Sequence, residues 1–385
     1  MRERKRKQIE NTVFLILITG IAMLTRLPLF PFESCDYYQF LRDWYAALQS
    51  NGGFAAVGMS IGDYMPTYLY LLAGMTYLPL SDLAGIKLVS CIADFLLAYF
   101  VRKIVNLHFG KDAYGTAAYA VILFLPSVVL NSAAWGQCDA IFTAALAATV
   151  YFLMTGKEAC AVTAFAVSFV FKLQAVFLAP FLFLLFLKRQ IRLRTFAIIP
   201  LVYGLSILPA ALCGRNLWEL LTVYISLSGK YKMVSMYLPN LYTWFPEHTP
   251  EYIGTAGVFF AGGLVLLSLF CLYKGQFAFT DEILLTLALF YALFVPFVLP
   301  HMHERYYYPA DILSVAYGFY FPEKFYVPVL TVLSSTYVVC HNLFQTDFLS
   351  VQFLSLVMLF VVVAVARHLY LQIKAEEPGR FYVQV

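Results

Sequence analysis

Long runs of apolar residues, separated by short polar clusters, dominate the chain from residue 11 to residue 373. A helix needs about 20 mostly apolar residues to cross the hydrocarbon core of a bilayer. The pattern predicts an all-α polytopic membrane protein with about 11–13 transmembrane helices. The apolar segments are residues 11–30, 82–105, 113–133, 137–155, 158–187, 195–213, 253–273, 280–299, 309–321, 325–342 and 347–373.

The segment 158–187 differs from the others because polar Lys172 and Gln174 interrupt it. We read it as two helices of about 14 residues, each about 21 Å long at 1.5 Å per residue. Neither half spans a hydrocarbon core that is about 30 Å thick. The sequence therefore predicts a broken pair that turns within the outer leaflet. Because unwound backbone at that depth is tolerated only beside a cavity, we expect the turn at Lys172 to line one.

Two segments between the apolar runs are too long to be simple connectors. The first, 31–81, contains an amphipathic stretch at 37–48 and an aromatic run at 64–80. We expect both to form helices that lie in the membrane interface. The second is 214–252. With no internal repeat visible, the whole chain, 1–385, is predicted to be one integral-membrane domain with two large loops.

Composition and charge agree with this interpretation. With 62% hydrophobic residues, 12% charged residues and a mean hydropathy of +0.76, the chain does not fit a water-soluble, disordered or nucleic-acid-binding protein. The seven cysteines show no CxxC pair and no metal-ligand spacing, so we expect small apolar fillers. If successive loops are placed alternately on the two sides of the membrane, most Lys and Arg residues lie on the same side as the basic N-terminus. The positive-inside rule then places both termini in the cytoplasm and the two large loops outside the cell membrane.

The polar residues on the outer side gather in five clusters, each next to a predicted helix end. Polar groups at or below the membrane surface are costly unless they are paired or functional. Their convergence on one side predicts a single extracytoplasmic site. The clusters are 33–38, 62–68, 135–139, 172–174 and 300–309.

A carboxylate, several cations and a lipid-facing location together suit the transfer of a sugar from a lipid-linked phosphate. Such a transfer needs a base for the incoming hydroxyl and cations for the departing phosphate. Asp36 is the expected catalytic base, and Asp63 and Asp139 are secondary acidic candidates. The expected ligands of the donor phosphate are Arg305, His303 and Lys172. Further substrate-binding candidates are Tyr37, Tyr64, Trp135, Gln137, Gln174, His301, Glu304 and Tyr306.

The order of these motifs resembles the GT-C superfamily of polytopic glycosyltransferases, which use polyprenyl-phosphate sugars. The resemblance is closest to bacterial proteins related to the second mannosyltransferase of GPI-anchor assembly. It implies a GT-C fold, an essential acid at Asp36, and inverting transfer of a mannose-like hexose to an extracytoplasmic glycan, lipid or polymer. The matching residues are Asp36-Tyr37, Asp63-Tyr64 with Pro66, Trp135-Gly136-Gln137 with Asp139, Lys172 with Gln174, and His303-Glu304-Arg305-Tyr306.

Structural explanations compete with these roles. Asp36, Asp63 and Asp139 each stand where a helix N-cap is expected. Lys172 could extend to the outer surface without touching a substrate. Cys35, rather than a second acid, precedes Asp36, which leaves open whether Asp36 acts alone or with Asp63.

Three other chemistries compete with sugar transfer. His301, His303 and Glu304 could hold a divalent metal, but three ligands within four residues of a turn have poor geometry, so no cofactor is expected. A transporter or flippase of a lipid-linked saccharide is the alternative function. It requires polar residues along both halves of the membrane path, whereas the clusters here are one-sided. An acyltransferase would place its His base on the cytoplasmic side.

Overall fold

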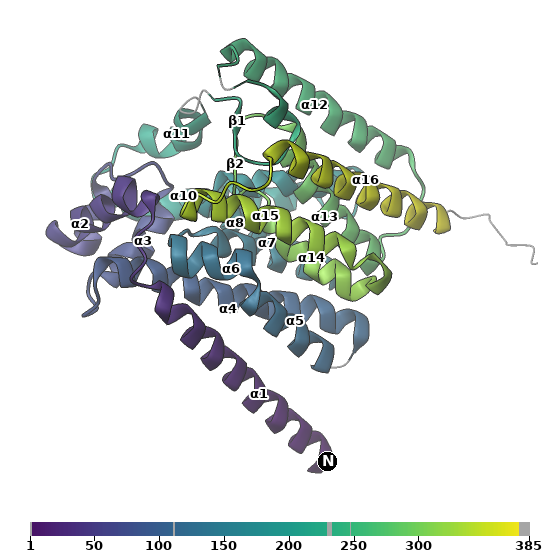
Figure 1. Ribbon diagram of the computed structural model, residues 1–385, viewed down its shortest axis with the longest axis horizontal. Coiled ribbons are helices and arrows are strands. Elements are labelled where there is room, and N and C mark those ends of the chain that lie inside the picture. Colours follow the sequence, from purple (N-terminus) through teal and green to yellow (C-terminus); the bar gives the residue numbers. More distant parts are fainter. Residues whose placement is uncertain (1, 111, 229–232, 247, 377–385) are drawn as a thin grey trace, which may run out of the picture.

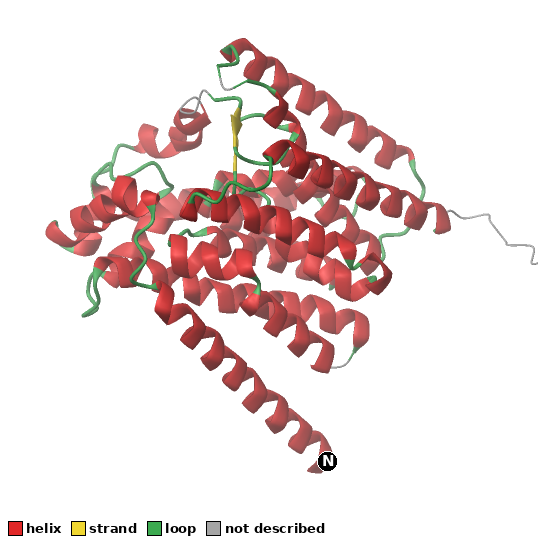
Figure 2. Ribbon diagram, in the orientation of Figure 1, coloured by secondary structure: helices red, strands yellow, loops and turns green. Residues whose placement is uncertain are grey.

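The computed structural model describes residues 2–110, 112–228, 233–246 and 248–376. These residues are mostly helical, with one pair of very short strands (Figure 2). Seven of the described helices are long and apolar enough to cross a membrane, or eight if the bent pair from Asp112 to Trp135 is one span. They confirm the expectation of an all-α, multi-pass membrane protein.

Fewer helices pass this length criterion than the expected 11–13 because several apolar helices in the described residues are short. They are Asp139–Met154, Glu158–Phe171, Leu173–Leu187 and Leu217–Leu227. A helix of about 15 residues is only about 22 Å long. All of the apolar segments expected from the sequence nevertheless overlap helices of the structure.

Three groups of elements follow one another along the chain (Figure 1). The first is α1 (Arg2–Arg26), η1 (Leu27–Leu29), η2 (Tyr37–Leu41), α2 (Arg42–Ser50), η3 (Gly53–Gly58) and α3 (Pro66–Met75). The second is α4 (Asp82–Phe109), α5 (Asp112–Phe124), α6 (Pro126–Val129), η4 (Leu130–Trp135), α7 (Asp139–Met154), α8 (Glu158–Phe171), η5 (Leu173–Leu178), α9 (Ala179–Leu187), η6 (Leu193–Ala197) and α10 (Ile198–Leu212). The third is α11 (Leu217–Ser228), β1 (Ser235–Met236), η7 (Leu241–Trp244), α12 (Glu251–Lys274), α13 (Asp281–Val298), β2 (Met302–His303), α14 (Tyr308–Tyr320), η8 (Pro322–Lys324), α15 (Tyr326–Phe344) and α16 (Val351–Ala375).

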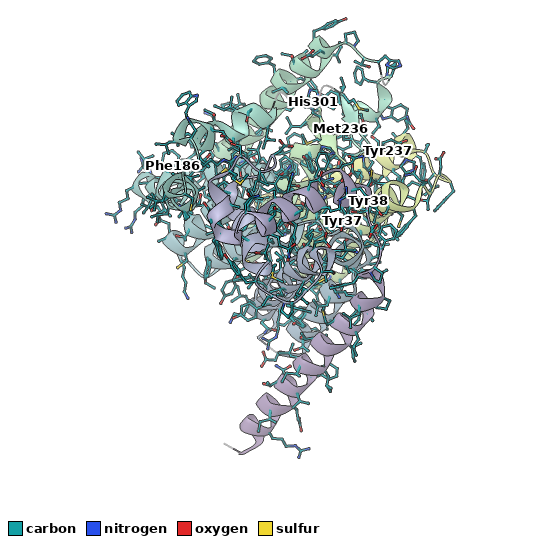
Figure 3. All side chains as sticks on the ribbon, turned by 90° about the vertical axis from the view of Figure 1, so that its left-hand side faces the viewer. Tyr37, Tyr38, Phe186, Met236, Tyr237 and His301 are labelled. Atoms are coloured by element: carbon teal, nitrogen blue, oxygen red, sulfur yellow. The ribbon has the colours of Figure 1, made fainter. Side chains whose placement is uncertain are left out.

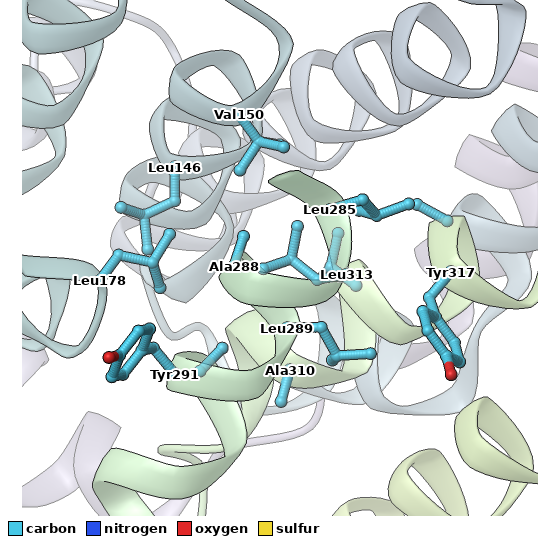
Figure 4. Packing of buried hydrophobic residues seen from close by; sticks show 14 of the residues in the cluster. Leu146, Val150, Leu178, Leu285, Ala288, Leu289, Tyr291, Ala310, Leu313 and Tyr317 are labelled. Carbon is cyan, nitrogen blue, oxygen red and sulfur yellow. The ribbon is translucent and has the colours of Figure 1, made fainter. Parts of the chain in front are cut away.

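Helix α13 forms the centre of the bundle. Of its residues, 83% are buried, compared with 11% in the most apolar part of the first span and 17% in that of α12. Leu285 and Leu289 of α13 belong to the same cluster of buried residues as Leu146 of α7, Leu178 of η5 and Leu313 of α14 (Figure 4). Helix α1 extends away from the rest (Figure 1). The exposed apolar faces of α1 and α12 are those expected of helices in contact with lipid.

Two interruptions shape the second group of helices. Lys172 has an extended backbone, with φ −154° and ψ 136°, between α8 and η5. This confirms the predicted break. The segment expected at 113–133 is instead bent by 51° at Leu125, where Pro126 begins α6. Proline has no N–H to donate to the preceding turn, so the bend has a local cause.

The 31–81 segment contains the helices expected in it. The amphipathic stretch forms η2, a π-helix, followed by α2, and the aromatic run forms α3. Gly52 and Gly53 have positive φ angles of 85° and 64°, which glycine adopts at little cost, and they turn the chain between the two. In Figure 1, α2, α3, α10 and α11 gather at one end of the molecule.

A buried lysine holds this segment to the bundle. Lys87 of α4 is completely buried, and its ammonium donates to the carbonyls of Leu29, Phe30 and Phe32 at 2.8, 3.0 and 2.5 Å. These three acceptors match the three N–H groups of an ammonium. The contact fixes the segment that follows α1, just before the chain reaches Asp36.

Replacing this lysine, Lys87→Met, is expected to lower the free energy of unfolding by about 1–3 kcal/mol, because methionine keeps the apolar stem but leaves buried carbonyls unpaired. Denaturant titration of the detergent-solubilised protein measures the change. Lys157→Met, at an exposed position before α8, is the matched control and should be neutral. Equal stability of both variants would show that the three carbonyls find other partners.

Candidate functional site

A pocket of about 500 Å³ lies where the polar clusters meet. It is lined by residues of η2, α2, the turn before α3, the turn before α7, the Lys172 break, α11, α12, the loop between α13 and α14, and the end of α15. The residues singled out from the sequence that line it are Asp36, Asp63, Tyr64, Gln137, Lys172, Gln174, His301, His303, Glu304, Arg305 and Tyr306. All five clusters therefore contribute to one cavity.

Asp36 is half-buried at the start of the π-helix η2. Its carboxylate oxygen Oδ2 accepts hydrogen bonds from Trp135 Nε1, at 3.1 Å, and from Gln137 Nε2. It makes no capping hydrogen bond to the helix, so the N-cap explanation does not account for it. Ser34 holds the chain just before Asp36 against the same turn, because its hydroxyl donates to the carbonyl of Trp135 at 2.9 Å. Two donors on one oxygen hold the carboxylate in a set orientation.

The partners of Asp36 come from the turn that ends η4. This π-helix places Trp135 in the interior, and Gly136 follows with φ +78°, a left-handed conformation that favours glycine. The backbone N–H of Gln137 then donates to the carbonyl of Asn131 at 2.9 Å. The turn brings the side chains of Trp135 and Gln137 to the same carboxylate oxygen.

Lys172 and Asp139 form a buried ion pair. Asp139 also accepts from Asn131 Nδ2 at 2.8 Å. Lys172 is only 6% exposed, so it does not extend to the surface as the alternative explanation required. The extended backbone at the helix break turns its ammonium into the bundle. Breaking the helix here places a cation at the wall of the pocket.

Arg305 stands at the centre of the polar contacts. Its Nη1 lies 2.9 Å from Glu304 Oε1, and its Nε lies 3.7 Å from Asp139 Oδ2. Its guanidinium also packs over the Trp135 ring at 5.1 Å. Burial alone would raise the pKa of Glu304, but the interaction with His303 and the charge of Arg305 outweigh it and hold that pKa below its ordinary value. Glu304 is therefore ionised at neutral pH and balances Arg305.

The loop that carries Arg305 is fixed by a parallel two-stranded pairing. Ser235 and Met236 of β1 pair with Met302 and His303 of β2. His301, just before β2, has φ +61°, and its ring Nδ1 lies 2.7 Å from the carbonyl of Met233. In Figure 3, where the left-hand side of Figure 1 faces the viewer, His301 and Met236 lie above Tyr37 and Tyr38 of η2. The strained loop is thereby held by the segment before η7.

Three of the expected site residues lie behind the pocket lining. Trp135 and Asp139 are almost completely buried and support Asp36, Lys172 and Arg305 from behind. Tyr37 points to the other side of η2, where its hydroxyl donates to Asp82 at 2.8 Å. Adjacent residues of a helix face different directions, so Asp36 and Tyr37 cannot both point into the pocket.

Several lining residues were not among the candidates singled out in the sequence. They are Gln39 and Phe40 of η2, Trp44 of α2 and Asn342 near the end of α15. The spacing of Asp36, Phe40 and Trp44 at intervals of four residues was a usable signal, because such residues share one helix face.

The chemistry of the pocket is set by paired opposite charges. The two cations, Lys172 and Arg305, already face carboxylates, so an anionic ligand has to share them. No group of three His, Cys, Asp or Glu side chains in the described part of the chain is arranged to hold a metal ion. No protein-family model and no curated protein matches the chain.

Proposed function

We propose that this protein is a membrane glycosyltransferase of GT-C type. In this proposal it moves a hexose, mannose-like by resemblance, from a polyprenyl-phosphate sugar to an extracytoplasmic glycan, lipid or polymer. One observation carries the proposal. Asp36 lines a pocket within an apolar bundle, held by Trp135 and Gln137, and Lys172 and Arg305 line the same pocket. A base and a phosphate-binding pair are the groups that this transfer requires.

The reaction is a single displacement that inverts the anomeric carbon. The acceptor oxygen forms a bond to that carbon while its proton passes to Asp36. The bond between the anomeric carbon and the phosphate oxygen breaks, and the polyprenyl phosphate leaves with the electron pair. Arg305, with Lys172 and His303, stabilises the charge that develops on the phosphate. Asp36 then returns its proton to water.

The charge balance of the pocket favours a donor with one phosphate. Lys172 is paired with Asp139, and Arg305 with Glu304. A sugar attached to a single polyprenyl phosphate is a phosphodiester with one negative charge, whereas a sugar diphosphate brings two. Because each added charge must be balanced by cations that are already shared, the singly charged donor suits this site better.

The proposed topology follows from the distribution of basic residues. Both termini lie in the cytoplasm, and the pocket lies on the extracytoplasmic side of the cell membrane. This arrangement suits a polyprenyl-linked donor whose sugar faces outward. Partners other than donor, acceptor and membrane lipid are not required.

Transfer of labelled hexose in reconstituted vesicles tests the proposal. The purified protein is supplied with a panel of polyprenyl-phosphate sugars, including mannose and glucose, and with a mixture of glycan and lipid acceptors. We expect label to move to an acceptor from one donor. If no donor is consumed while labelled lipid crosses the bilayer, the protein is a flippase of lipid-linked saccharides instead.

Trp135→Phe is expected to lower the rate of this transfer by about 10- to 100-fold, because a hydrogen bond to a charged group contributes about 1.5–3 kcal/mol. Phenylalanine removes the indole N–H that orients Asp36 but keeps an aromatic ring beside Arg305. Trp244→Phe removes an indole N–H that bonds Ser355 outside the pocket and serves as the control. Unchanged transfer in Trp135→Phe would mean that Gln137 alone orients the carboxylate.

A further inference from the structure

The pocket has an aromatic corner that the proposed chemistry at Asp36 does not use. Phe40 and Trp44 follow Asp36 at intervals of four residues, and all three line the pocket. They form a stripe on one face of η2 and α2. Eight residues of helix correspond to about 12 Å, so the stripe leads away from Asp36 by about that distance. A molecule whose hydroxyl reaches Asp36 can lie along it.

Trp44 is held in place by its neighbours. A Cβ added at Gly62 would lie 2.5 and 2.7 Å from Cε2 and Cδ2 of the Trp44 indole. These two carbons join the rings, so the backbone of Gly62 lies over one face of the indole rather than at its edge. Gly62 also has φ +65°. Tyr64 packs edge-to-face with Trp44 at 5.3 Å, and the ring of Phe40 lies 6.1 Å away.

Polar groups border the same part of the pocket. Gln39 is exposed beside Phe40, and Asp63 precedes Tyr64; both line the cavity. An apolar ring surface with amide and carboxylate groups at its margin matches a pyranose, which has an apolar face and a rim of hydroxyls. A lipid acceptor, by contrast, would need a wholly apolar path to Asp36, which the polar margin of this surface does not provide.

We propose that Phe40, Trp44 and Tyr64 form the binding platform for a glycan acceptor, on which a sugar ring packs while the next sugar presents its hydroxyl to Asp36. This inference rests on the proposed function for the role of Asp36. It narrows the acceptor from glycan, lipid or polymer to a glycan with at least two sugar units. Sugar binding to the platform does not itself require the donor.

Disaccharide binding to the reconstituted full-length protein tests the platform independently of transfer. The probes are mannobiose, cellobiose, maltose and chitobiose. Each is titrated to roughly 50 mM by isothermal calorimetry, so that dissociation constants in the millimolar range are detected. The variants are Trp44→Leu, which keeps an apolar side chain but removes the aromatic face, and Trp44→Phe, which keeps one. Trp218→Leu is the control, because Trp218 is 74% exposed on α11 and does not line the pocket.

We expect at least one disaccharide to bind, and Trp44→Leu to weaken that binding about tenfold while Trp44→Phe retains most of it. In the transfer assay, Trp44→Leu should raise the KM for a glycan acceptor without a matching loss of kcat. Binding that Trp44→Leu leaves intact, or no binding by any of the four probes, overturns the inference. If the probes bind through Trp44 but no donor is consumed, the platform stands and the proposed function fails.

Discussion

Asp36→Asn is expected to abolish measurable sugar transfer, with a loss of at least about a hundredfold, the contribution typical of a general base. Asparagine has nearly the same size and still offers an oxygen to Trp135 and Gln137, so the pocket should keep its shape. Its amide cannot take a proton from the acceptor. Initial rates at saturating donor, measured in vesicles with the protein amount matched, give the effect. Binding of the donor should change much less than kcat.

Asp43→Asn is the matched control for this variant. Asp43 lies on α2, seven residues beyond Asp36, and its side chain is 69% exposed. The same chemical change there should leave transfer within about twofold of the unmodified protein, as for an exposed ion pair of little energetic weight. Transfer that survives Asp36→Asn would move the base to Asp63, which lines the same pocket. Asp139 is a weaker candidate for the base because its carboxylate already pairs with Lys172 and accepts a hydrogen bond from Asn131.

The second large effect is on stability. Asp94→Leu is expected to lower the free energy of unfolding by about 3–5 kcal/mol, because it leaves the buried charge of Arg26 without its partner. Both side chains are completely buried, and Arg26 Nη2 lies 2.9 Å from Asp94 Oδ2. Ser132 of η4 also donates to this oxygen at 2.6 Å. Denaturant titration in detergent, followed by helical circular dichroism, gives the loss.

Two further variants separate the buried charge from the change in packing. The double variant Arg26→Met with Asp94→Leu removes both charges and should recover most of the lost stability. Asp112→Leu breaks a partly exposed pair with Arg102, which should cost only about 0–1 kcal/mol. A double variant that is as unstable as Asp94→Leu alone would show that packing around α1, rather than charge, is responsible.

The apolar pattern predicted the helices well because membrane burial leaves so few alternatives. The extra polar pair at Lys172 and Gln174 was enough to predict the break after α8. The bend at Pro126 was missed because the apolar residues on both sides continue the hydrophobic run without a change. The proline itself was the local signal, because it has no N–H to donate to the preceding turn.

The sequence predicted which clusters of residues form the candidate site, but not the direction in which each side chain points. The sequence grouped Trp135 with the substrate-binding residues, yet η4 turns its ring behind Asp36 and under Arg305. The π-helix and the left-handed Gly136 set that direction, and neither is visible in a hydrophobic pattern. Trp44 was overlooked for the opposite reason, since an aromatic residue in an interfacial helix is ordinarily a contact with lipid headgroups.

The pocket is built from two parts of the chain that are made at different times. Asp36, Gln137 and Lys172 come early, and Arg305 follows more than 130 residues after Lys172. At about 5–20 residues per second, synthesis of that interval takes about 7–26 s. Lys172 and Asp139 both belong to the early part, so their buried ion pair does not depend on Arg305. The pocket is therefore complete only when the loop before α14, which carries Arg305, has joined the earlier part of the chain.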